Sequence, residues 1–186
     1  MVSGFIPVVI NRRKYIDRKK TYIVIANHTS MLDIMMTYVT VPNLFLFIGK
    51  KELESWPLFG FFYKRTNILV DRKSLASRRD VFHEARKSLQ EKVGVCIYPE
   101  GGVPDDRTIL LWPFKIGAFR LAVEEGIDIL PITFPDNKKH QPYSITDGGY
   151  PGILRGIVHR PIEVKNRSEK EVRDLAFRLM RITLRH

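Results

Sequence analysis

Three residues that could take part in chemistry stand within two positions of the end of an apolar run. His28 follows YIVIA, Arg72 follows NILV and Glu100 follows VGVCIY. An imidazole can act as a general base, a guanidinium can bind a phosphate, and a carboxylate can bind polar groups. Ligands of open α/β sheets bind outside the carboxyl ends of the strands. If the three runs are parallel strands, these side chains share one edge of the sheet and form a site.

His28 and Asp33 form the sharpest candidate pair. Residues five apart on one helix point about 140° apart, so the two can meet only if His28 lies just before a helix and Asp33 one turn inside it. Ser30 and Asp33 have the spacing of a capping box that would start such a helix at Ser30. That box alone would explain Asp33 structurally. Alternatively, Asp33 accepts a hydrogen bond from one ring nitrogen of His28, and the other nitrogen acts as a general base.

Other interpretations of His28 have less support. Asn27-His28-Thr29 matches a glycosylation acceptor, but no secretion signal is evident and Asn27 directly follows an apolar run. The remaining histidines, which are His83, His140, His159 and His186, show no metal-ligand spacing. We therefore predict no metal and no cofactor. The single cysteine, Cys96, lies in an apolar run and is expected to be buried.

The composition is typical of one globular domain, which we expect to span residues 1–186. The formal net charge is +11, which favours a polyanionic partner such as nucleic acid, an anionic lipid surface or a phosphorylated small molecule. No window approaches the ~20 apolar residues that a transmembrane helix needs. The sequence therefore predicts a soluble or peripheral protein.

Apolar runs and amphipathic stretches alternate along the chain. Strands are predicted at residues 22–26, 44–48, 67–70, 93–98 and 127–133, with one or two more within 152–164. Helices are predicted at 74–92, 114–126 and 168–184, and Ser168 and Glu171 form a capping box at the start of the last. Residues 135–151 are rich in turn formers and predict a loop. This alternation indicates an α/β fold with a parallel or mixed sheet.

Four blocks of the chain resemble, in order, the glycerolipid acyltransferase family, which includes the lysophosphatidate acyltransferases. NHTSMLD resembles the first block, an H-x4-D motif, and NILVDRK resembles the second. IYPEGG resembles the third, usually FPEGTR, and ILPITF resembles the fourth. The match runs from about residue 20 to about residue 165. The resemblance implies a glycerol-3-phosphate acyltransferase-like fold, with a mostly parallel or mixed central sheet flanked by helices.

The resemblance also implies an activity: transfer of a fatty acyl group from acyl-CoA or acyl carrier protein to the free hydroxyl of lysophosphatidate, giving phosphatidate in phospholipid biosynthesis. His28 would remove the hydroxyl proton, and Asp33 would hold the imidazole and stabilise its charged form. This chemistry needs no metal and no covalent acyl-enzyme. The resemblance also implies that Arg72 binds the acceptor phosphate and that Glu100, Gly101 and Gly102 contribute to acceptor binding. For Glu100, a structural salt bridge is the alternative.

The chain departs from the family pattern in two blocks. Val103 stands where the third block often has an arginine, so one expected phosphate contact is absent. Lys115, in PFKIG, or Arg107 is a candidate for the missing charge. Leu69 replaces the phenylalanine common in the second block. These changes leave an acyltransferase as the expectation but weaken the choice of lysophosphatidate as acceptor.

Bacterial members of the family usually begin with a hydrophobic segment that seats them in the membrane. Only about twenty residues precede the predicted sheet, so residues 1–20 are either the remainder of such a segment or part of a domain that docks peripherally. WPLFGFFYKR (56–65) is a candidate contact with an anionic membrane surface, although core packing is the favoured explanation for most of its rings. We expect a peripheral protein at the cytoplasmic face of the membrane.

Two alternatives remain open at the level of sequence. A non-catalytic basic module that binds membrane or nucleic acid would account for the charge, but it gives no reason for His28, Arg72 and Glu100 at successive strand ends. An acyltransferase with another acceptor, such as a lyso-aminolipid, would keep the catalytic pair and change the phosphate site. The principal interpretation predicts a lysophospholipid acceptor and no nucleic acid.

Overall fold

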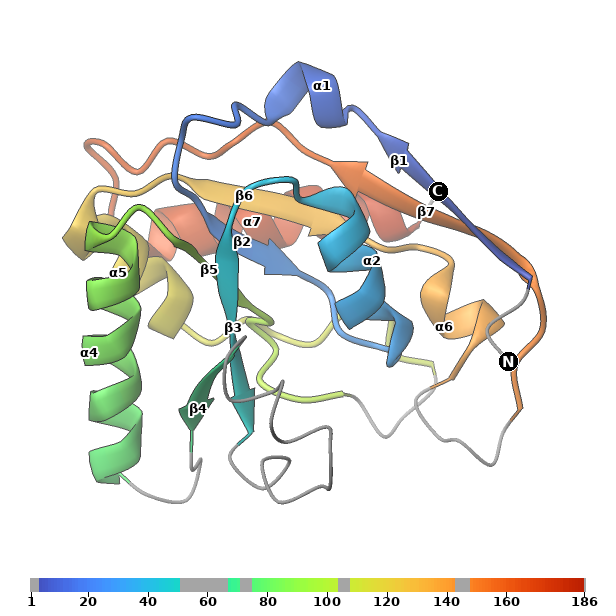
Figure 1. Cartoon of the computed structure of the whole chain (residues 1–186), viewed down its shortest axis with the longest axis horizontal. Coiled ribbons are helices and arrows are strands. Elements are labelled where there is room, and N and C mark those ends of the chain that lie inside the picture. The colour runs from blue at the N-terminus through green and yellow to red at the C-terminus, as the bar shows by residue number, and fades with distance from the viewer. Residues whose placement is uncertain (1–3, 51–66, 71–74, 104–107, 143–147, 186) are drawn as a thin grey trace.

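The computed structural model describes residues 4–50, 67–70, 75–103, 108–142 and 148–185, which form one seven-stranded sheet with helices on both faces (Figure 1). The order across the sheet is β1-β7-β6-β2-β5-β3-β4. Six of these strands lie where the apolar runs predict them, and β1 does not. The strands are β1 (Phe5–Ile10), β2 (Ile23–Ala26), β3 (Phe45–Lys50), β4 (Asn67–Val70), β5 (Gly94–Ile97), β6 (Ile129–Thr133) and β7 (Gly152–Val158).

The sheet is mixed. The neighbouring strands β6, β2, β5, β3 and β4 all run parallel, β7 is antiparallel to β6, and β1 is parallel to β7. The carboxyl ends of β2, β5 and β6 therefore meet at one edge, as the argument from strand ends requires. The predicted fold class, a mostly parallel or mixed sheet between helices, is confirmed.

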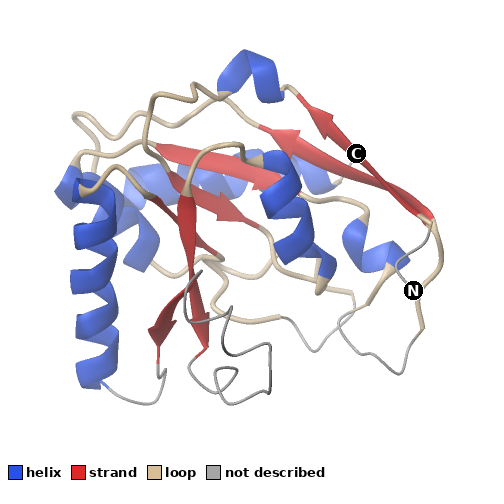
Figure 2. Ribbon diagram, viewed as in Figure 1, coloured by secondary structure: helices blue, strands red, loops and turns tan. Residues whose placement is uncertain are grey.

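The helices divide between the two faces because side chains alternate along each strand. Ile23 and Ile25 of β2 face a core formed with α4, α5 and α7, whereas Val24 and Ala26 face a second core that includes Met36 of α2. Figure 2 shows α2 and α7 on opposite sides of the strands. The helices are α1 (Arg12–Tyr15), α2 (Leu32–Thr40), α4 (Leu75–Gln90), α5 (Gly117–Glu125), α6 (Asn137–His140) and α7 (Glu169–Leu184).

Two elements differ from the sequence-based expectation. Residues 5–10 form the edge strand β1 although Pro7 interrupts the apolar stretch, because an edge strand pairs on one side and tolerates a residue without an N–H. The predicted loop at 135–151 contains the one-turn helix α6. The capping box at Ser168 and Glu171 forms as predicted. Within the described ranges, no helix combines the length and hydropathy that crossing a bilayer demands.

Candidate active site

The loop between β2 and α2 holds the predicted pair together. His28 Nδ1 lies 3.1 Å from Asp33 Oδ2. Asn27, the residue after β2, is pinned because its amide donates to the Phe134 carbonyl and accepts from the Phe134 N–H, at 3.0 and 2.8 Å. The end of β2 is thereby tied to the residue after β6. Since the backbone is fixed on one side of His28 and enters a helix on the other, the imidazole has a defined direction.

Asp33 is fully buried and each of its oxygens accepts hydrogen bonds. Oδ2 accepts from the backbone N–H groups of Thr29 and Ser30, at 2.6 and 2.8 Å, as well as facing His28 Nδ1. Ser30 Oγ accepts from the Leu32 N–H rather than from Asp33, so only half of the predicted capping box forms. The two interpretations of Asp33 are therefore compatible, because one carboxylate caps the start of α2 and holds His28.

The imidazole of His28 is held on its edge by Asp33 and on one face by an aromatic ring. The Tyr98 ring stacks on it with centroids 4.1 Å apart and planes 14° apart. The Tyr98 hydroxyl lies 3.3 Å from the Thr37 hydroxyl, which donates to the Asp33 carbonyl at 2.7 Å. Burial raises the pKa of Tyr98 well above its usual value, so the phenol stays protonated and donates to Thr37. The side chain of His28 is 16% exposed, which leaves a narrow approach for a reactant.

Glu100 is buried, with 2% of its surface exposed, and it joins two loops of the site. Oε1 accepts from the His28 N–H at 2.7 Å, and Oε2 accepts from the Trp112 N–H at 2.8 Å. Burial raises the pKa of Glu100 to about 7, although the two backbone N–H groups act in the opposite direction. The geometry gives Glu100 a role in positioning the backbone at His28, and contact with the acceptor stays a prediction.

The pKa of Glu100 predicts a pH-dependent stability. With a folded-state pKa of about 7 against the usual 4.5, the folded protein retains a proton that the unfolded chain releases. Stability should therefore fall as the pH rises from about 5 to about 7, by roughly 2–3 kcal/mol. Urea unfolding of wild type and Glu100→Gln across this range measures the effect. We expect the difference between the unfolding free energies of the two proteins to change with pH. If the two free energies varied with pH in the same way, the raised pKa of Glu100 would be contradicted.

The turn after β5 places a lysine against the glycine pair. Gly101 has a φ of 74°, and a Cβ there would overlap the Lys115 side chain. A Cβ at Gly102 would meet only ordinary contacts, so the steric requirement for glycine falls on position 101. The Lys115 N–H donates to the Pro99 carbonyl at 2.8 Å, and its side chain is exposed. An exposed cation beside an open turn is suited to bind an anion.

The structure brings most of the predicted site residues to one edge of the sheet. His28, Asp33, Glu100, Gly101 and Lys115 are joined by the contacts given above. Gly102 is adjacent to them in the chain. Arg72 and Arg107 lie outside the described residues, as does the stretch at 56–65, and their roles stay predictions. Among the residues that are described, no three His, Cys, Asp or Glu side chains gather closely enough to hold a metal ion.

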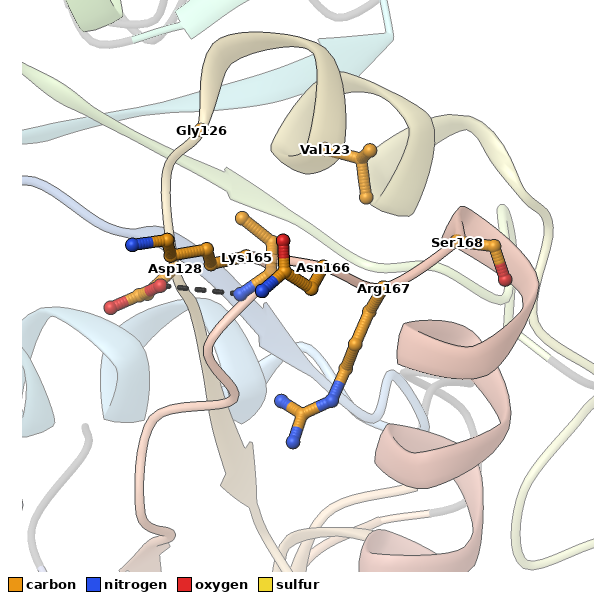
Figure 3. A pocket seen from close by; sticks show the side chains of 8 residues that line it. Val123, Gly126, Asp128, Lys165, Asn166, Arg167 and Ser168 are labelled. Atoms are coloured by element: carbon orange, nitrogen blue, oxygen red, sulfur yellow. Dashed lines mark hydrogen bonds between the residues drawn. The ribbon is translucent and has the colours of Figure 1, made fainter.

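An open hollow lies away from this edge. Its volume is about 600 Å³, and it is formed by the end of α5 and the loop before α7, including Gly126, Asp128, Lys165 and Arg167 (Figure 3). Asp128 directly precedes β6, so the hollow lies at the amino ends of the parallel strands. None of the predicted site residues lines it. This hollow is therefore separate from the candidate site.

Two residues of the site were missed in the sequence. Tyr98 lies in a predicted strand and Asn137 in a predicted loop. In the structure, Tyr98 stacks on His28 and Asn137 donates to Asp33 Oδ1 at 2.8 Å. Asn137 follows the carboxyl end of β6. Asn137 lies further from the end of its strand than the two positions within which His28, Arg72 and Glu100 follow theirs, so the same rule does not reach it.

Comparison with known proteins identifies the family of this chain. A family model described as Acyltransferase matches residues 7–135. The chain belongs to the Acyltransferase family. This membership confirms the resemblance seen in the four sequence blocks.

Curated relatives of this family member include several 1-acyl-sn-glycerol-3-phosphate acyltransferases. A 1-acyl-sn-glycerol-3-phosphate acyltransferase of Haemophilus influenzae is 31% identical over 157 residues, which cover 83% of this chain and 63% of that protein. One from Saccharomyces cerevisiae is 28% identical over 164 residues, covering 85% of this chain and 52% of that protein. This family member thus spans between half and two thirds of the length of these relatives.

A solved structure shows the same fold. The crystal structure of the 1-acyl-sn-glycerophosphate acyltransferase from Thermotoga maritima superposes with a TM-score of 0.82. It covers 96% of this chain and 70% of that one, at 23% sequence identity. At that identity the likeness establishes the architecture of this acyltransferase family member and leaves its substrates to be argued from the site.

Proposed function

We propose that this domain transfers a fatty acyl group from a thioester donor, acyl-CoA or acyl carrier protein, to the free hydroxyl of lysophosphatidate, forming phosphatidate. The observation that carries the proposal is the contact between His28 Nδ1 and Asp33 Oδ2 at the carboxyl edge of the sheet. The names of the relatives, which are 1-acyl-sn-glycerol-3-phosphate acyltransferases, support the choice of acceptor.

The proposed reaction needs one general base and an acceptor hydroxyl that attacks the thioester carbonyl. His28 Nε2 accepts the proton of the acceptor hydroxyl as the oxygen attacks the thioester carbonyl carbon. The tetrahedral intermediate then collapses, the carbon–sulfur bond breaks, and the imidazolium returns its proton to the leaving thiolate. Asp33 stabilises the imidazolium between these steps, because its buried carboxylate faces the Nδ1–H.

Release of free thiol tests the function directly. Purified protein with acyl-CoA should release CoA when lysophosphatidate is added, and mass spectrometry should detect phosphatidate. Crossing acyl-CoA and acyl carrier protein donors with phosphate-bearing and lyso-aminolipid acceptors would identify both substrates. A thiol release that occurs only with the lyso-aminolipid would replace the proposed acceptor, and none with any pair would favour a non-catalytic module.

The exposed Lys115 supports a phosphate contact in the proposed site. Its side chain lies across Gly101, a turn position within the third block, which lacks the usual arginine. We expect Lys115→Met to raise the KM for lysophosphatidate about tenfold and to leave kcat nearly unchanged, since a charge-assisted contact contributes to binding in both states. Lys87→Met, on the surface of α4, is the matched control. An unchanged KM would contradict the role.

A lipid surface is the proposed source of the acceptor. Met31, directly before α2, and Met35 and Tyr38 on α2 form an exposed stripe beside the loop that carries His28, with Met35 61% exposed. The chain carries a net charge of +11. Apolar side chains next to a strongly basic surface suit an anionic bilayer. Met35→Glu should weaken binding to anionic vesicles about tenfold, measured by co-sedimentation. Ile182→Glu, on α7 across the sheet, should bind like wild type, and equal losses would contradict this docking face.

A further inference from the structure

A buried asparagine occupies the side of Asp33 that His28 does not use. Asn137, the first residue of α6, is fully buried and its Nδ2 donates to Asp33 Oδ1 at 2.8 Å. No other hydrogen bond to that oxygen is found in the described parts of the chain. The amide orientation follows from chemistry, because an ionised carboxylate only accepts. The three groups thus form a chain from His28 through Asp33 to Asn137.

The segment that carries Asn137 is fastened on both sides. The Asp136 carboxylate accepts three hydrogen bonds from Arg155 of β7, at 2.7 to 3.0 Å. The donors are the backbone N–H, Nε and Nη2 of Arg155. The Gln141 carbonyl accepts from Ser30 Oγ at 2.6 Å. Asn137 Oδ1 has no partner among the described residues, so the side chain is held at this place through Nδ2 and through its backbone. A group fixed this firmly can orient another.

We propose that Asn137 is a positioning residue of the active site, whose amide holds the Asp33 carboxylate turned toward His28. This inference rests on the proposed function. A buried carboxylate stays charged only if donors surround it. Oδ2 has three N–H partners, whereas Oδ1 relies on Asn137. Without this donor, the carboxylate would rotate away from His28, and the imidazolium that forms during the reaction would lose part of its counter-charge.

A double-mutant cycle with Asp33 separates positioning from simple structural support. We expect Asn137→Ala to lower kcat about tenfold with KM changed less than about twofold. In an Asp33→Asn background, the same change should cost nothing further, because the group on which Asn137 acts has lost its charge. Asn43→Ala, which removes an asparagine that donates to the carbonyls of Asp17 and Lys20 far from the site, is the control for loss of an amide. Additive losses in the cycle would overturn the proposal.

The isosteric variant Asn137→Asp keeps the shape and gives a readout that needs no activity. The introduced carboxyl group, when protonated, can donate to Asp33 as the amide does, but two facing carboxylates repel each other. Repulsion raises the pKa of the new group above its unfolded value, so the melting temperature should fall below that of wild type increasingly as the pH rises. Other titratable or charged groups around this place are His28, Tyr98, Glu100, Lys138, Asp136, Arg155 and His140.

Exchanging the two residues provides the deciding comparison. In the double variant Asp33→Asn/Asn137→Asp, the amide of one side chain again faces the carboxylate of the other. Its melting temperature at about pH 8 should exceed that of Asn137→Asp, while kcat stays as low as in Asp33→Asn. A double variant no more stable than Asn137→Asp would overturn the proposal. A wild type without acyl transfer would overturn the proposed function and the positioning role with it, whereas an active wild type with additive losses overturns the role of Asn137 alone.

Discussion

Replacing His28 with alanine is expected to lower kcat/KM for acyl transfer by about 10²–10⁴-fold, the contribution of a positioned general base. The loss should be nearly independent of the acceptor, because the base acts on the hydroxyl rather than on the headgroup. The fold should persist, since the backbone N–H of residue 28 still donates to Glu100. Thiol release from acyl-CoA in the presence of lysophosphatidate measures the effect.

His83→Ala is the matched control for this experiment. His83 is exposed on α4, which packs on the other face of the sheet from α2. It should retain wild-type kcat/KM, and both variants should melt cooperatively. If His28→Ala retained more than about half of the wild-type kcat/KM, His28 would not be the base and the proposed mechanism would be wrong.

Replacing Asp33 with asparagine is the second change with a large expected effect, a loss of about 10²–10⁴-fold in kcat. The new amide oxygen can accept from Thr29 and Ser30, and its nitrogen would then face Asn137. Asn137 can turn its unpartnered Oδ1 toward that nitrogen, so the packing survives while the charge is lost. The variant therefore isolates the electrostatic contribution of Asp33 to the imidazolium.

Steady-state kinetics and urea unfolding of the same preparation distinguish this loss from misfolding. We expect kcat to fall, KM to change little, and the free energy of unfolding to drop by no more than about 1–2 kcal/mol. Asp174→Asn, on the exposed side of α7, should alter neither quantity. A variant that loses its stability in proportion to its activity would argue that Asp33 serves mainly as a helix cap.

The elements that could be predicted from the sequence are those whose structure depends on the local pattern of apolar residues. The strands β2, β5 and β6 are mostly apolar and buried on both faces, so their positions follow from the sequence even though Pro131 lies within β6. The pairing of His28 with Asp33 was also predictable. At a spacing of five residues, the two side chains can meet only if His28 lies just before a helix and Asp33 lies one turn inside it. Strand β1 was not, since Pro7 argues against a strand until its position at the sheet edge is known.

The contacts that could not be predicted join groups far apart in the chain or use the backbone. Asn137 reaches Asp33 across 104 positions, and no local pattern records such a pairing. Glu100 was expected to bind the acceptor, but its partners in the structure are the N–H groups of His28 and Trp112. Every residue except proline carries an N–H, so a sequence gives no sign of which ones a buried carboxylate will find.

The only cysteine makes the thiol chemistry of the assay unusually clean. Cys96 is fully buried in β5, and burial raises its pKa well above the usual value. Disulfide reagents react with thiolates, so in the native protein they should detect released CoA and spare the enzyme. The same reagents should label Cys96 only once the centre of the sheet opens. One natural side chain can thus report global unfolding during catalysis, with no fluorophore or engineered label.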